Sequence, residues 1–176
     1  MSTLITTTVQ GVQNIKYDGS TTAMTIDSDG RVSTPVRPAF STHRTSSLSI
    51  SNTNATIVFN AVTHNQGGHY NSGTGIFTAP VSGLYFLSAA LGVQNGADSR
   101  YFVIYLQTGD TDYQDLLLTR RDNAVNTTGT TYAGVNVSGV VSLNANDGVR
   151  VKAEMENSSN AVVSDKSCYF TGYFIG

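Results

Sequence analysis

The sequence has little of what builds helices and long apolar segments. Its 176 residues include no tryptophan, one cysteine, three prolines, two glutamates and three lysines. Glutamate and lysine are the usual residues of exposed helix faces, so their scarcity argues against a helical protein. Threonine (23), serine (19) and asparagine (14) are abundant instead, and they suit pleated strands and turns. The composition therefore predicts an all-β fold.

The same scarcity excludes several kinds of partner. A single cysteine, Cys168, cannot form a disulfide within the chain, and we expect a buried reduced thiol. No apolar run approaches the ~20 residues of a membrane-spanning helix, so no membrane insertion is expected. The formal charge is −2, and the only adjacent basic pair is Arg120-Arg121. Such a chain lacks the basic surface that nucleic-acid binding requires.

No residue constellation indicates an enzyme. The three histidines, His43, His64 and His69, lack the spacing of a helical zinc site. No order of serine, histidine and aspartate suggests a triad, and no glycine-rich phosphate loop is present. Carboxylates are few and lie in predicted loops, which argues against a buried acid–base pair. The sequence thus predicts a non-enzymatic protein.

Residues 1–37 form a region of their own, with too few large apolar residues to fold alone. Residues 1–8 lack the basic and apolar segments of a signal peptide, so we expect synthesis in a cytoplasm. Further on, residues 21–26 alternate, residues 27–30 (DSDG) favour a turn, and residues 31–33 return, which predicts a β-hairpin. Its apolar strip, the expected contact surface of this arm, consists of Met24, Ile26 and Val32.

The remainder of the chain reads as a series of short strands. Pro35 and Pro38 favour an extended linker, and polar turns then separate the apolar segments. Residues 84–93 are apolar on both faces and predict a central strand. This spacing is typical of a sandwich or jelly roll. Strands are expected at about residues 39–42, 56–59, 76–78, 84–93, 100–106, 115–121, 131–143, 149–155 and 168–175.

Several motifs in this part resemble the C1q-like domain, the jelly roll shared with the tumour-necrosis-factor group. The resemblance covers residues 38–176 and implies a ten-strand sandwich that assembles as a homotrimer. In relatives the inner sheet forms the contact between copies. The motifs are GGHYN at 67–71, TGIFTAP at 74–80, SGLYF at 82–86 and FTGYF at 170–174, with PAFS at 38–41 and NDGVRV at 146–151. The interface residues so implied are Phe40, Tyr85, Tyr169 and Tyr173.

A second resemblance concerns the arm. Residues 22–32 (TAMTIDSDGRV) are similar to N-terminal segments of virion appendage proteins of tailed phages, especially marine ones. The similarity implies that residues 1–37 bind other virion proteins, while residues 38–176 form a head on the virion surface. Synthesis in a host cytoplasm fits that location.

Two clusters are candidates for ligand binding. Asp110, Asp112 and Asp115 make the one acidic cluster, and carboxylate oxygens on a loop suit calcium, although their spacing matches no specific calcium loop and a solvated turn between strands is the simpler interpretation. Arg120 and Arg121 suit a carboxylate or sulfate on a glycan, or they pair with neighbouring aspartates. Calcium is the only cofactor to consider.

The leading hypothesis is a non-enzymatic phage surface protein, such as a tail fibre or knob, whose trimeric head recognises a host-surface glycan or protein. One alternative is a purely structural decoration, or cement, protein of the capsid or tail. A second alternative is a soluble C1q-like lectin of cellular origin, against which the phage-like arm counts. The surface that the arm touches in an assembled particle separates these hypotheses.

Overall fold

The computed structural model describes residues 13–50, 55–95, 99–109, 115–125, 131–155, 160–162 and 167–176. The chain divides into two compact units, Met1–Arg37 and Pro38–Gly176. We call them the arm and the head. In the described part of the chain, no helix has the length and apolarity needed to cross a membrane.

The arm contains the predicted hairpin and one additional strand. β2 (Thr22–Ile26) pairs with β3 (Val32–Ser33), and β1 (Asn14–Lys16) pairs with the other edge of β2. The turn between β2 and β3 depends on Asp27, whose carboxylate accepts hydrogen bonds from the backbone N–H of Asp29 and of Arg31, both at 2.9 Å. The side chain of Arg31 closes the turn with a 2.7 Å ion pair to the same carboxylate.

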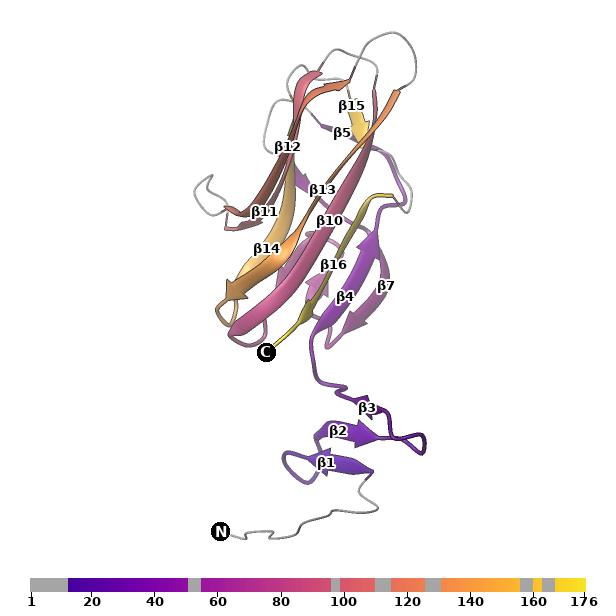
Figure 1. Cartoon of the computed structure of the whole chain (residues 1–176), viewed down its shortest axis with the longest axis vertical. Helices are drawn as coiled ribbons and strands as arrows, with labels where there is room; N and C mark the ends of the chain where they lie inside the picture. Colours follow the sequence, from indigo (N-terminus) through magenta and orange to yellow (C-terminus); the bar gives the residue numbers. More distant parts are fainter. Residues whose placement is uncertain are drawn as a thin grey trace. The chain divides into compact units, whose positions relative to one another are not determined.

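The head is all-β, with two antiparallel sheets typical of a jelly roll (Figure 1). In the first sheet the long strand β10 pairs with β13 along one edge and with β16 and β15 along the other. β16 then pairs with β4, β4 with β7, and β15 with β5. Figure 1 shows β10, β16, β4 and β7 side by side. The bounds are β4 Ala39–His43, β5 Leu48–Ile50, β7 Ala61–Gln66, β10 Gly83–Asn95, β13 Thr131–Leu143, β15 Asn160–Val162 and β16 Tyr169–Phe174.

The second sheet is built around β14, which pairs with β11 on one edge and with β9 and β6 on the other. β12 lies beyond β11, and β8 lies beyond β9. The bounds are β6 Ala55–Ile57, β8 Tyr70–Asn71, β9 Ile76–Thr78, β11 Ser99–Thr108, β12 Asp115–Val125 and β14 Gly148–Met155.

In the part of the head that the structure describes, thirteen strand segments fill ten positions. β9 and β6 follow one another along the same edge of β14, at residues 148–150 and 151–153. β16 and β15 likewise share one edge of β10, and their partners β4 and β5 share the next position. Each sheet therefore has five positions, which agrees with the predicted ten-strand sandwich.

The core lies between the two sheets and follows the alternation of the strands. The first sheet contributes inward-facing residues from β4, β10, β13 and β16, and the second contributes them from β6, β9, β11 and β14. Fully buried members include Tyr85, Leu87, Ala89, Val93, Phe102, Ile104, Leu106, Val149, Val151 and Phe170.

Aromatic rings join the two sheets at the centre of this core. The ring of Phe40 stacks on Phe77 with centroids 4.6 Å apart, and it meets Phe170 edge-on at 4.7 Å. The ring of Tyr70 also stacks on Phe40, with centroids 5.4 Å apart. The Tyr70 hydroxyl donates to the Phe59 carbonyl oxygen at 3.0 Å, so the GGHYN motif serves packing.

The FTGYF motif needs its glycine because β16 passes close to its neighbours. A Cβ at Gly172 would lie 2.5 Å from Leu87 Cδ2 and 2.9 Å from Phe40 Cε1. The missing side chain lets the Phe40 ring reach Phe77 across the core.

Replacing Phe40 with alanine should destabilise the head by about 3–5 kcal/mol, because the change leaves a cavity where the ring now packs. Leu118→Ala is the control, since Leu118 is 51% exposed on β12, and it should cost less than about 0.5 kcal/mol. Urea denaturation at one fixed protein concentration measures both. Equal losses for the two variants would contradict a core organised around Phe40.

Candidate functional site: the outer face of the first sheet

The first sheet has one face in the core and another that the head leaves exposed. Along β10, Tyr85, Leu87 and Ala89 point into the core, so the intervening residues point outward. Leu84 is 46% exposed, and Phe86 is half-buried. We call this surface the outer face; it consists of the outward residues of β10, β13, β16 and β4.

Cross-strand pairing arranges the outer face in rows. In the apolar row, Phe86 lies between Val140 of β13 and Tyr173 of β16. Val140 is 55% exposed and Tyr173 is 51% exposed, so this apolar surface is open. The ring centroids of Phe86 and Tyr173 are 5.4 Å apart. The next two rows are Ser138, Ser88, Thr171 and then Asn136, Ala90, Tyr169.

The outer face carries no charge along its described strands. The described outward positions of these four strands, β10, β13, β16 and β4, include no aspartate, glutamate, lysine or arginine. His43, at the end of β4, is the titratable exception besides the two tyrosines, and its Nδ1 lies 3.4 Å from Thr63 Oγ1. A scarcity of charged residues is typical of the part of a protein surface that another protein covers.

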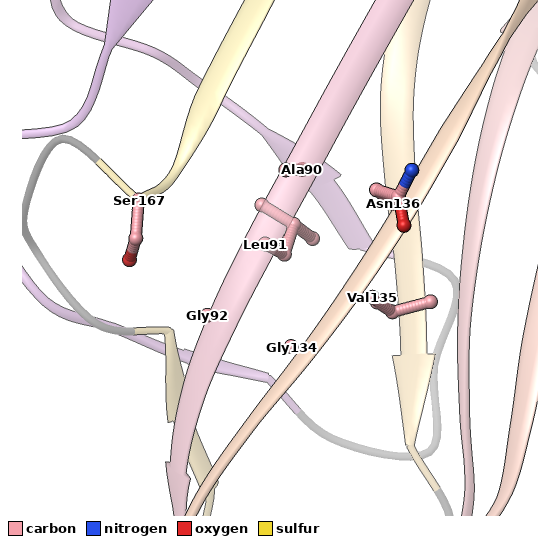
Figure 2. Close-up of a pocket in the computed structure, with 7 residues that line it drawn as sticks. All are labelled: Ala90, Leu91, Gly92, Gly134, Val135, Asn136 and Ser167. Carbon is pink, nitrogen blue, oxygen red and sulfur yellow. The ribbon is translucent and has the colours of Figure 1, made fainter.

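A hollow of about 180 Å³ interrupts the outer face beyond the Ala90 row (Figure 2). It forms because Gly92 of β10 and Gly134 of β13 are cross-strand partners, and neither has a side chain. Figure 2 shows Ser167 on one side of β10 and Asn136 on the other. The hollow is shallow, uncharged and continuous with the outer face.

The second sheet presents a different surface, which combines tyrosines with charged groups. Glu154 on β14 accepts a hydrogen bond from the Tyr101 hydroxyl at 2.6 Å and a longer one from the Tyr105 hydroxyl at 3.3 Å. The guanidinium of Arg120 lies 4.5 Å from the centroid of the Tyr101 ring. These contacts hold all four side chains to one another across β11, β12 and β14.

The sequence of the head matches a known family. The model of the C1q domain matches residues 39–175, which is most of the chain and nearly all of the head. The chain belongs to the C1q domain family. The resemblance read from the motifs is thereby confirmed, and domains of this type are in general not enzymes.

Solved structures share the fold of the head. Murine APRIL at pH 5.0 superposes with a TM-score of 0.60 at 11% identity, covering 79% of this chain and 99% of that one. The Eiger TNF from S. frugiperda gives a TM-score of 0.59 at 10% identity, covering 80% and 93%. At such identities the likeness shows the fold alone. A comparison with curated proteins finds no match.

The four predicted interface residues of the C1q head divide into two pairs. Phe40 and Tyr85 are 2% and 0% exposed inside one chain, and the Tyr85 hydroxyl donates to the Val81 carbonyl oxygen at 2.7 Å. Both are core residues, so their side chains are not available to a second copy, and we correct that assignment. Tyr169 and Tyr173 do lie on the outer face, and their role between copies stays a prediction.

The predicted ligand residues are only partly described. Asp110 and Asp112 lie outside the described residues, and Asp115 begins β12 without a described side chain. Calcium binding there stays a prediction, and no cluster of three or more metal-ligating side chains occurs among described residues. Arg120 is exposed beside Tyr101, whereas for Arg121 only the backbone in β12 is described.

The arm residues lie on the predicted hairpin. Ile26 pairs with Val32 between β2 and β3, and Met24 pairs with Ile15 of β1. Met24 and Ile26 are half-buried, and Val32 is 58% exposed. The attachment role of this strip stays a prediction.

Sequence reasoning did not identify the apolar residues of the outer face. Leu84, Phe86 and Val140 were read only as parts of apolar strands. Their signal is a cross-strand one, because Phe86 and Val140 become neighbours only once β10 and β13 are in register. The bonds of Tyr101 and Tyr105 to Glu154 depend on register in the same way.

Asp18 in the arm should titrate at an unusually low pH. Backbone N–H groups of Thr21 and Ser20 donate to its carboxylate and lower its pKa from 3.8 to about 2. These bonds form the turn between β1 and β2. Because the pKa of Asp18 is lower in the folded state, the carboxylate stabilises this turn above pH 3.8, and that stabilisation is lost as the pH falls through about 2. NMR titration of the carboxyl carbon measures it. An ordinary pKa for Asp18 would contradict the described turn, and Asp18→Asn should remove the transition.

Proposed function

We propose that the head is a non-enzymatic homotrimeric module in which three copies pack through their outer faces. The observation that carries this proposal is the apolar row of Val140, Phe86 and Tyr173 on an uncharged sheet face. The C1q fold is compatible with a trimeric module. Closed three-fold packing removes one such face per copy from water without leaving an open end.

Three half-exposed apolar side chains on each copy supply a driving force for association. Leu84, Val140 and Tyr173 are about half exposed in one chain, so each has apolar area left to bury. Full burial of a large apolar side chain contributes about 1.5–3 kcal/mol. Three copies together offer nine such side chains, and their burial works against the roughly 4–15 kcal/mol that each association step costs.

The small residues of the outer face suit close packing. Ser88, Ala90 and Gly92 succeed one another at the outward positions of β10, which is paired along both of its edges. Short side chains let the backbones of neighbouring copies approach, while the larger rings of Tyr169 and Tyr173 flank them on β16. We infer that β10 lies nearest the three-fold axis.

We further propose that the trimer is a surface protein of a tailed-phage particle, with the arm as its attachment. The similarity of residues 22–32 to phage appendage segments supports this, as does the separation of arm and head into two units. The outward side of the trimer would then be the second sheet, whose Tyr101, Tyr105, Glu154 and Arg120 suit polar contacts with a host-surface glycan or protein. A head that only packs against capsid or tail proteins is the alternative.

Val140→Glu should convert the trimer to single chains, because assembly would bury three carboxylates together. The association constant should fall at least about a hundredfold, since a buried unpaired charge costs several kcal/mol. Leu118→Glu is the matched control, as Leu118 is 51% exposed on the second sheet. Sedimentation equilibrium reports the mass. A Val140→Glu protein with the mass of the unaltered assembly would contradict the proposed interface.

Met24→Asp together with Ile26→Asp should abolish incorporation into phage particles and leave the head folded. These half-buried side chains carry the apolar strip of the arm, and a carboxylate there disfavours any apolar contact. Tyr17→Ser, at an 88% exposed position of the arm, is the control and should load normally. Quantitative mass spectrometry of purified particles gives the copy number. Normal loading of the double variant would shift attachment to the head and favour the decoration alternative.

A further inference from the structure

Arg44 is a cation placed inside the head. It follows β4 directly and continues the inward alternation of Phe40 and Thr42. Its backbone N–H donates to the Cys168 carbonyl oxygen at 3.2 Å, so the ladder with β16 extends to this residue. Only 6% of Arg44 is exposed. The side chain therefore enters the space between the sheets near one end of the sandwich.

With the described residues, the guanidinium of Arg44 makes three hydrogen bonds, all to backbone carbonyl oxygens. Nε and Nη2 donate to Ser46 O at 3.1 and 2.9 Å, and Nη1 donates to Val58 O. A guanidinium has five N–H donors, so these bonds leave two of them. No carboxylate of the described residues forms an ion pair with Arg44. Burial lowers its pKa, which reflects the cost of a desolvated charge.

A cavity of about 260 Å³ adjoins this guanidinium. Its volume exceeds the roughly 30 Å³ share of one water molecule several times, so it can hold a small organic group. The wall mixes two apolar side chains with hydroxyl and amide groups, the usual lining of a small-ligand site. It is lined by Arg44, Ser46, Leu48, Thr56, Val58 and Asn60.

The polar wall of the cavity is held in place. Asn60 accepts a hydrogen bond from the Thr45 backbone N–H at 3.1 Å and donates to the Thr45 hydroxyl at 2.7 Å. Arg44 itself joins the segment after β6 to the end of β4 through Val58 and Ser46. The cation thus has a fixed position before any ligand enters, which lowers the entropic cost of binding.

A purely structural role, in which Arg44 only links two segments, explains its three bonds to carbonyl oxygens. It does not explain why this position carries a buried full charge. Carbonyl dipoles offset part of the desolvation cost, whereas a buried charge is ordinarily paired with an opposite one. A planar carboxylate matches the fork of a guanidinium. We propose that this cavity binds the carboxylate of a small organic acid through Arg44, with Leu48 and Val58 against its apolar part. The site belongs to the inner side of β4, so it does not depend on the proposed trimer.

Two sources supply such a carboxylate, an acidic sugar and a simple free acid. The full-length protein is titrated with sodium galacturonate, sodium acetate and neutral galactose in low-chloride buffer. Both acids should shift the Arg44 Nε–H resonance and the backbone amides of Leu48 and Thr56, and galactose should not. Tighter binding of galacturonate than of acetate identifies a sugar acid as the preferred source, and equal binding identifies the free carboxylate. Absence of any shift up to tens of millimolar of either acid would overturn the proposal.

Variants separate a binding site from a purely structural role. Arg44→Lys keeps the charge and loses the fork, and it should weaken acetate binding at least about tenfold, as loss of a charge-assisted hydrogen bond does. Because that change also removes the carbonyl bonds, Leu48→Phe provides a second variant that fills the cavity and leaves Arg44 in place. It should block both acids. Arg37→Lys, at an exposed arginine that precedes β4 in the chain, is the control and should bind normally. Unchanged binding in Leu48→Phe would place the acid elsewhere and overturn the cavity as its site.

Discussion

The packing of the Phe40 ring between the two sheets is the contact on which the rest of the head depends. Phe40 belongs to β4 of the first sheet, and it stacks on Phe77 of β9 in the second sheet at 4.6 Å. Tyr85 extends the same cluster, with its ring 5.7 Å from Phe77 and 5.1 Å from Phe174. These contacts determine where β4, β10 and β16 lie and which of their side chains point into the core. Reversing the facing of any one of them would expose a large ring.

The two surfaces of interest follow from that inward facing. Because the large rings of β4 and the core side of β10 point inward, the outward positions of β10 are left with Ser88, Ala90 and Gly92 beside the apolar row. The inward series of β4 ends on Arg44, which brings a guanidinium to the end of the core. The outer face and the Arg44 cavity thus lie on opposite sides of the same sheet.

Sequence reasoning predicts the architecture better than it predicts whether a given side chain points into the core or outward. The alternation of residues 131–143 and the motifs of the C1q domain were sufficient for an all-β sandwich with its boundary at residue 38. Residues 84–93, by contrast, are apolar on both faces, so no alternation shows that Tyr85 points inward. Phe40 lies in a strand too short to show its parity. Two of the four residues expected at the interface are therefore core residues. Phe86 and Val140 were not predicted, because they become neighbours only through the register of β10 and β13.

We propose that other copies of the chain cover the outer face of the first sheet. Val140 and Leu118 have nearly equal exposure in one chain, 55% and 51%, and lie on opposite sheets. Val140→Cys and Leu118→Cys therefore make a matched pair for thiol labelling, with the fully buried Cys168 as an internal reference. In the assembled protein the thiol at position 140 should label much more slowly than the thiol at position 118, and dilution to concentrations at which the trimer dissociates should equalise the rates. Equal labelling of the two thiols before dilution would show that no other copy covers the outer face.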